Sequence, residues 1–159
     1  MELNFTLNGN NVSIDTEGDK RLLDLLREDF HLTSVKEGCS EGECGGCTVI
    51  MDNKAVTSCL VLAAQVDGSE IITTEGLAKN GELDIIQKAF KNNDAVQCGF
   101  CTPGMIMSAK ALLLKDKEPE KEDIEEAIAG NLCRCTGYVN IINAIAEAAD
   151  KLEVEENEK

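Results

Sequence analysis

Apolar and polar residues alternate with a period of two along the first part of the chain. Residues 3–7 follow this alternation, Asn8-Gly9 is a turn signal, and residues 12–14 resume the same pattern. Successive side chains of a strand point to opposite faces, so the pattern predicts a two-stranded hairpin with one buried face.

A short helix and further strands are predicted in the next part of the chain. Leucines recur at helical spacing in residues 22–26, which predicts a helix that covers the inner face of the hairpin. Strand-like runs follow at residues 48–51, 55–58 and 70–73. Together these elements predict a small mixed sheet with one packed helix.

The period of the apolar residues changes from two to about 3.6 after residue 76. Groups with this spacing occupy residues 83–90, 105–112, 124–128 and 141–152, which predicts four amphipathic helices packed as a small bundle. The predicted fold class is therefore α+β, with two domains and a short acidic tail. The predicted ranges are 1–75 for the first domain, 76–152 for the helical domain and 153–159 for the tail.

The charge of the chain is strongly negative, with 30 acidic and 15 basic residues and a formal net charge of −15. Such a chain repels nucleic-acid phosphates and anionic lipid headgroups, so proteins are the expected partners. No apolar stretch approaches the roughly 18 residues of a membrane-spanning helix. The first residues show no basic region followed by an apolar run, so a cytoplasmic location is expected.

Eight cysteines divide into two sets of four, and the first set lies around a glycine-rich loop. In a reducing compartment such clustered thiols favour metal binding over disulfides. The first set has the spacing C-x4-C-x2-C with a distant fourth cysteine, which is typical of plant-type ferredoxins with a 2Fe-2S cluster. Zinc is the competing occupant, since four thiolates also suit a tetrahedral ion. The residues are Cys39, Cys44, Cys47 and Cys59.

The glycines of this loop have a predicted role of their own. A loop that bends around a cluster needs positive backbone torsions and close approach, which glycine permits. Backbone amides of such a loop can then point at sulfur. The residues are Gly38, Gly42, Gly45 and Gly46.

The second set of cysteines combines a pair separated by two residues with a pair separated by one. The first pair is predicted at the start of a helix and the second in the turn before the last helix, so two connections would meet at one metal. By spacing alone, an iron-sulfur cluster and zinc both remain open for this set. The residues are Cys98, Cys101, Cys133 and Cys135.

Three stretches of the chain resemble the iron-sulfur subunit of the xanthine dehydrogenase family of molybdenum hydroxylases. This family includes bacterial aldehyde oxidoreductases and carbon monoxide dehydrogenases. The stretches read EGCSEGECGGCTV at 37–49, QCGFCTPGM at 97–105 and GNLCRCTGY at 130–138. The resemblance covers nearly the whole chain.

The resemblance implies a β-grasp, ferredoxin-like domain with one 2Fe-2S cluster and a four-helix domain with a second. It thereby assigns iron-sulfur to the second set of cysteines as well. In the family the second cluster lies next to the pterin of the molybdenum cofactor. The residues that match the family's pterin contacts are Gln97 and Cys135.

The implied function is electron transfer from the molybdenum cofactor, through both clusters, to FAD. Both of these cofactors are then carried by partner subunits in a heterotrimeric oxidoreductase, and a dimer of heterotrimers is one assembly that the resemblance allows. No catalytic residue is predicted on this chain, and the substrate is a purine, another N-heterocycle, an aldehyde or carbon monoxide. Two other functions stay open from the residues alone, a self-standing ferredoxin-like carrier and a zinc-binding scaffold.

Overall fold

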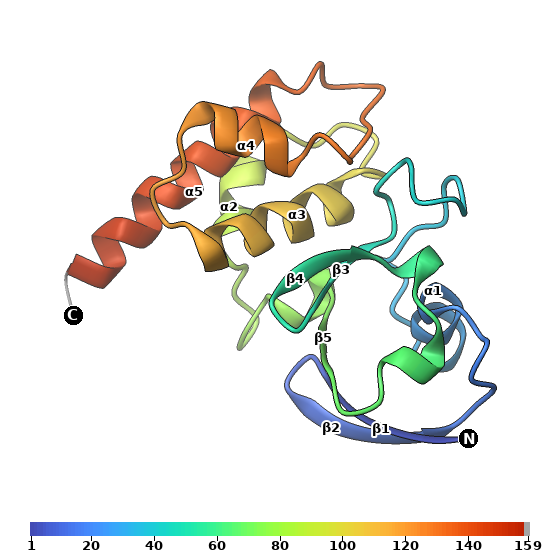
Figure 1. The fold of residues 1–159 in the computed structure, drawn as a ribbon. Helices are drawn as coiled ribbons and strands as arrows, with labels where there is room; N and C mark the ends of the chain where they lie inside the picture. Colours follow the sequence, from blue (N-terminus) through green and yellow to red (C-terminus); the bar gives the residue numbers. More distant parts are fainter. Residues whose placement is uncertain (158–159) are drawn as a thin grey trace.

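A computed structural model describes residues 1–157 as a mixed sheet flanked by helices (Figure 1). The sheet has five strands in the order β2-β1-β5-β3-β4. This mixture confirms the predicted α+β class. The strands are β1 (Glu2–Leu7), β2 (Asn10–Asp15), β3 (Thr48–Met51), β4 (Lys54–Thr57) and β5 (Glu70–Ile72).

The centre of the sheet is a parallel pair, β1 and β5, in which Thr6 lies opposite Glu70 and Leu7 opposite Ile71. The remaining neighbours are antiparallel, including the predicted hairpin of β1 with β2. The apolar residues of β1 are buried, and β2 is an edge strand whose apolar residues are partly buried. The alternation along residues 3–7 therefore predicted the buried face of β1 correctly.

The predicted short helix is present as α1 (Leu22–Asp24), which continues as the wider turns of η1 (Leu25–Asp29). Its leucines are fully buried and share one hydrophobic cluster with Leu3, Phe5 and Leu7 of β1. Three short 3-10 turns complete this part of the chain. They are η2 (Ser58–Leu60), η3 (Ala63–Gln65) and η4 (Thr74–Gly76).

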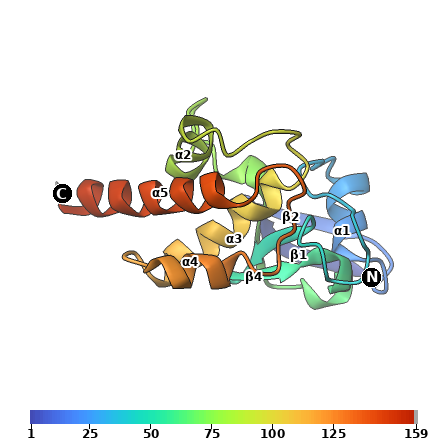
Figure 2. The ribbon, with the colours of Figure 1, turned by 90° about the horizontal axis from the view of Figure 1, so that it is seen from above.

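Four longer helices lie in the regions where helical spacing predicted them. Helix α3 packs against β3 and β4, and α5 packs against α2 and α4 (Figures 1 and 2). The helices share a second hydrophobic cluster, which also includes Ile50 of β3. They are α2 (Ile85–Asn92), α3 (Thr102–Lys115), α4 (Lys121–Ala127) and α5 (Val139–Asn157).

Two predicted helix boundaries differ from those in the structure. Leu83 lies before α2 and is 44% exposed, because Asp84 caps the helix by accepting a hydrogen bond from the Ile86 amide at 2.9 Å. Helix α5 continues to Asn157, into the range predicted as an acidic tail, and the last two residues of that range, 158–159, lie outside the described residues. Within residues 1–157, no helix has the length and apolar character needed to cross a bilayer.

Phe90 is the largest fully buried side chain among the described residues and is 1% exposed, so its removal tests the helical core. We expect Phe90→Ala to lower the free energy of unfolding by about 3–5 kcal/mol, because it removes buried apolar area and leaves a cavity. Leu114→Ala is the control, since Leu114 is 46% exposed and its change should stay within about 0.5 kcal/mol. Urea titration of both variants measures the difference, and equal effects would contradict this packing.

Candidate metal centre

The glycine-rich loop at residues 37–47 lies between η1 and β3 and has no regular secondary structure. Gly42 and Gly45 have positive φ angles of 83° and 71°, as the sequence predicted for this loop, whereas Gly38 and Gly46 do not. Position 38 has no room for a side chain, because a Cβ atom there would lie 2.7 Å from the Cys44 sulfur, so Gly38 is required for steric reasons. The loop can therefore close tightly around its thiols.

Backbone amides of the loop point at sulfur. The Cys39 Sγ accepts hydrogen bonds from the amides of Glu41 at 3.5 Å, Glu43 at 3.3 Å and Cys44 at 3.4 Å. These bonds, the Glu41 amide first, lower the pKa of the Cys39 thiol to about 7. The Gly46 amide donates to the Cys44 Sγ at 3.5 Å. The loop thus favours the thiolate form that binds metal.

Cys47 and Cys59 form the buried side of the same site. Ser58 fixes them together, because its amide and hydroxyl donate to the Cys47 carbonyl at 3.2 and 2.7 Å. Burial, followed by contact with the Cys47 thiol, raises the pKa of Cys59 to about 11. Cys59 directly follows Ser58, so it lies beside Cys47, the last cysteine of the loop.

The second site lies where two helix connections meet. Cys101 is the residue before α3, and burial followed by the Cys133 thiol raises its pKa to about 12. Burial also raises the pKa of Cys133, but hydrogen bonds from Thr136 dominate and lower it to about 7. The Thr136 hydroxyl donates to the Cys133 Sγ at 3.1 Å and its amide at 3.5 Å. The Cys133 amide in turn donates to the Tyr138 hydroxyl at 2.9 Å.

Solvent reaches the two sites unequally. Cys98 and Cys135 are exposed, and Gln97 beside them is exposed as well. A hydrogen bond with Cys98 raises the pKa of Cys135. In the first site Cys47 and Cys59 are buried, and Cys39 and Cys44 are partly buried. The second site is therefore the one that is open at the surface.

The eight thiols contact one another in four pairs, and each pair joins two cysteines of the same predicted set. All eight are free of disulfides. Within residues 1–157 they meet in pairs, and no three His, Cys, Asp or Glu side chains are gathered closely enough to hold a single ion. The contacts link Cys39 with Cys44, Cys47 with Cys59, Cys98 with Cys135 and Cys101 with Cys133.

The residues present fit a 2Fe-2S cluster at each site. Such a cluster takes four thiolates, and hydrogen bonds to the sulfurs stabilise its negative charge. Each site offers four thiols together with amide or hydroxyl donors. At the second site the Thr102 hydroxyl, next to Cys101, is buried and has no partner among the described residues, so it is free to donate to a further acceptor.

Sequence reasoning gave no role to the buried residue that joins the two sites. The Asn131 side chain, which is 5% exposed, donates to the Gly45 carbonyl at 3.1 Å and accepts from Ser108 at 2.7 Å. The adjacent Leu132 amide donates to the Cys44 carbonyl at 2.9 Å. The available signal was the position of an asparagine inside the stretch at 130–138.

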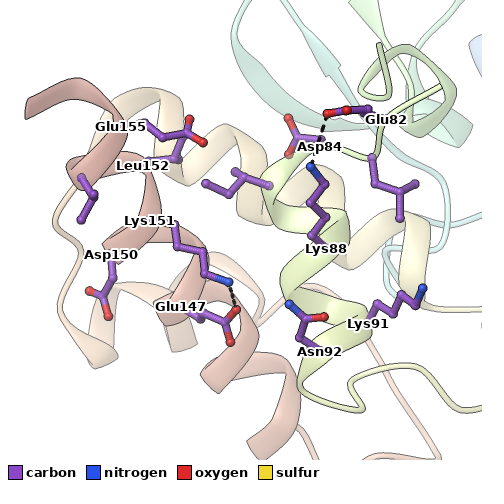
Figure 3. Close-up of a pocket in the computed structure, with 13 residues that line it drawn as sticks. Glu82, Asp84, Lys88, Lys91, Asn92, Glu147, Asp150, Lys151, Leu152 and Glu155 are labelled. Atoms are coloured by element: carbon purple, nitrogen blue, oxygen red, sulfur yellow. Dashed lines mark hydrogen bonds and ion pairs between the residues drawn. The ribbon is translucent and has the colours of Figure 1, made fainter. Parts of the chain in front are cut away.

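A large hollow lies away from the thiols. It is an open groove of about 1100 Å³ between α2 and the second half of α5 (Figure 3). Figure 3 shows charged side chains along its sides, including Lys151 paired with Glu147 and Lys88 paired with Glu82. The groove contains no cysteine, so it is separate from the metal sites.

Two family models match this chain. Residues 5–78 match the 2Fe-2S iron-sulfur cluster binding domain, and residues 73–146 match the 2Fe-2S binding domain. The nicotinate dehydrogenase small FeS subunit of Eubacterium barkeri is 58% identical over 95% of this chain and 96% of its own length. The xanthine dehydrogenase iron-sulfur-binding subunit of Escherichia coli O157:H7 is 49% identical over 92% of this chain and 93% of its own.

Solved structures give the same picture. A chain of quinoline 2-oxidoreductase from Pseudomonas putida 86 is 40% identical with a TM-score of 0.93, and the match covers 98% of both chains. The aldehyde oxidoreductase from Desulfovibrio gigas is 38% identical with a TM-score of 0.94. That match covers 98% of this chain and 17% of the other, so the fold also occurs as one part of a longer chain.

The uneven pKa values of the thiols are testable in the metal-free, reduced chain. We expect iodoacetamide to label Cys39 and Cys133 first near pH 7, because their pKa values are about 7, whereas Cys59 and Cys101 have pKa values of about 11 and 12. The labelling rate of the first two should fall about tenfold between pH 8 and pH 6 as their thiolates are protonated. Peptide mass spectrometry measures each site, and uniform labelling would contradict this order.

Proposed function

The chain belongs to the family of small iron-sulfur subunits found in xanthine and nicotinate dehydrogenases, and on that basis we propose that it transfers electrons within a molybdenum hydroxylase. The observation that carries the proposal is that eight free thiols pair within the two predicted sets, and that each set has hydrogen-bond donors to sulfur. The chain is then the electron-transfer part of a larger oxidoreductase and performs no substrate chemistry itself.

Each set of thiols holds one 2Fe-2S cluster in this proposal. A bound cluster of this kind accepts and releases one electron at a time. The chain's own amides and the Thr136 hydroxyl stabilise negative charge on the sulfurs, which raises the reduction potential of the site. The first cluster is held by Cys39, Cys44, Cys47 and Cys59, and the second by Cys98, Cys101, Cys133 and Cys135.

The chain's backbone supplies a short route between the two sites. The Leu132 amide donates to the Cys44 carbonyl at 2.9 Å, and Leu132 is bonded directly to Cys133. One hydrogen bond and a few covalent bonds therefore join a ligand of the first site to a ligand of the second. This connection supports electron transfer between the sites inside a single chain.

The exposure of the second site supports contact with a partner subunit there. We propose that Gln97 and Cys135, which are both exposed, contact the pterin of a molybdenum cofactor on one partner subunit. Electrons then pass from the second site to the first and on to FAD on another partner subunit. The proposed complex is a heterotrimer, or a dimer of such heterotrimers, in the cytoplasm.

The proposed domains correspond to the two sites. A β-grasp, ferredoxin-like domain at residues 1–75 holds the first cluster, and a four-helix domain at residues 76–152 holds the second. The parallel β1–β5 pair and the two matched family ranges, which overlap at residues 73–78, support a boundary there. The acidic end of the chain, from residue 153, has no assigned role.

Replacement of one ligand tests the independence of the two sites. We expect Cys44→Ala to reduce the iron content of the full chain from about four atoms to about two and to remove one of two EPR signals seen on reduction. The Ser13→Ala variant, which changes an exposed residue of β2, should keep both signals. Zinc in place of iron in the parent protein would contradict the proposal, and loss of both signals would contradict independent sites.

The proposed pterin contact of Gln97 is testable in the assembled complex, because Gln97 is not a metal ligand. We expect Gln97→Leu to keep the iron content and both EPR signals but to slow substrate-driven reduction of the clusters by about tenfold or more, since a polar contact at the entry point is lost. Asn92→Leu, in the groove of Figure 3 that has no cysteine in its lining, is the control. An unchanged rate in Gln97→Leu would remove this residue from the proposed route.

A further inference from the structure

We propose that Asn131 is a positioning residue that holds the first cluster loop against the helical part of the chain and so sets the spacing and orientation of the two sites. The inference rests on the proposed function, because it concerns the relation between two cluster sites. Asn131 is not one of the thiol ligands, and its side chain belongs to neither set. Its role is therefore separable from metal binding.

The side chain of Asn131 connects three segments that are distant in the sequence. Its Nδ2 donates to the Gly45 carbonyl at 3.1 Å and to the Thr48 hydroxyl at 3.4 Å, which belong to the first loop and to β3. Its Oδ1 accepts from the Ser108 hydroxyl on α3 at 2.7 Å. Asn131 itself lies two residues before Cys133. One amide therefore joins the first site, the second site and α3.

Burial gives these hydrogen bonds their importance. Asn131, Ser108 and Thr48 are 5%, 5% and 6% exposed, so water does not replace a lost partner easily. A buried polar group that loses its partner keeps the full cost of its desolvation, about 1–3 kcal/mol. The Thr48 hydroxyl also donates to the Gly45 carbonyl at 2.8 Å, which ties the end of the loop to β3 at the same point.

Close packing leaves the loop and the helical part little freedom at this contact. A Cβ atom at Gly104, on α3, would overlap the Gly45 carbonyl oxygen. A Cβ atom at Gly45 would overlap the Gly130 carbonyl oxygen and the Asn131 amide. Backbone therefore meets backbone directly on both sides of Asn131. A small displacement of this side chain would move one cluster loop relative to the other.

The hydrogen bond between the two sites lies next to Asn131. The Leu132 amide reaches the Cys44 carbonyl, one residue from Gly45, so the contacts of Asn131 and Leu132 share the same stretch of loop. When the hydrogen bond from Asn131 to the Gly45 carbonyl is lost, the hydrogen bond between the Leu132 amide and the Cys44 carbonyl should open more often. Electron tunnelling falls steeply with distance, so this geometry affects the rate between the sites.

The Asn131→Asp variant of the full, cluster-loaded chain tests the proposal. The change keeps the acceptor for Ser108 but replaces the donors to Gly45 and Thr48 by a carboxylate oxygen. We expect iron content and the number of reduced spins to stay unchanged while the magnetic splitting between the two reduced clusters changes in EPR. Amide hydrogen exchange at Leu132 should become about tenfold faster, as expected for the loss of one buried hydrogen bond.

Two further variants complete the test. Asn10→Asp makes the same chemical change at an exposed position of β2 and should alter neither the splitting nor the exchange. Ser108→Ala leaves the donors of Asn131 in place and frees only Oδ1, so it should shift both measurements in the same direction by less. If Asn131→Asp does not retain both clusters, Ser108→Ala still tests the positioning role.

Failure of this inference differs from failure of the proposed function. If the parent chain shows no pair of reduced clusters, the proposed function fails, and exchange at Leu132 in the same variants still tests the contact. If both clusters are present but Asn131→Asp leaves the splitting and the exchange unchanged, the positioning role is wrong. Unchanged splitting and exchange in Ser108→Ala as well would show that the hydrogen bonds among Ser108, Asn131 and Gly45 do not position the two sites.

Discussion

Repulsion between neighbouring thiolates is the constraint on which this structure depends, because the cysteines of each predicted set contact one another in pairs. The chain limits this repulsion in two ways. Hydrogen-bond donors stabilise the charge on some sulfurs, and burial keeps other thiols protonated. Each set has one thiol whose pKa is lowered to about 7, Cys39 or Cys133, and one whose pKa is raised to about 11 or 12, Cys59 or Cys101. The metal-free sites are therefore only partly ionised near neutral pH, and metal binding must release the remaining protons.

Regular secondary structure holds the irregular loops that carry these thiols. The first loop ends directly at β3, and its buried partner Cys59 lies in η2 just beyond β4. In the second site, α3 begins directly after Cys101, and α5 begins shortly after Cys135. Functional loops supported at both ends by packed elements keep their geometry with little help from their own side chains. The buried network around Asn131 then joins the two supported loops.

Local patterns predicted the parts of the structure that depend on local chemistry. The alternation in residues 3–7 predicted β1, and the thiol contacts of the structure join cysteines that the spacing had placed in the same set. Helical spacing wrongly extended α2 back to Leu83, because Asp84 caps the N-terminus of the helix, which begins at Ile85. Strand order was not predictable in this way, since the central pair joins residues 6–7 to residues 70–71. The role of Asn131 was missed for the same reason, as its partners lie in the first loop and in α3.

The thiols of the two sites differ in their exposure to solvent, which matters before the chain assembles with other subunits. Cys98 and Cys135 are open to solvent, whereas Cys47 and Cys59 are enclosed. Oxygen and peroxides attack cysteines that solvent reaches more readily than enclosed ones. In the proposed complex, a partner subunit that contacts Gln97 and Cys135 also covers these exposed thiols. Assembly would then shield the second site from oxidation, whereas the chain's own fold already shields Cys47 and Cys59.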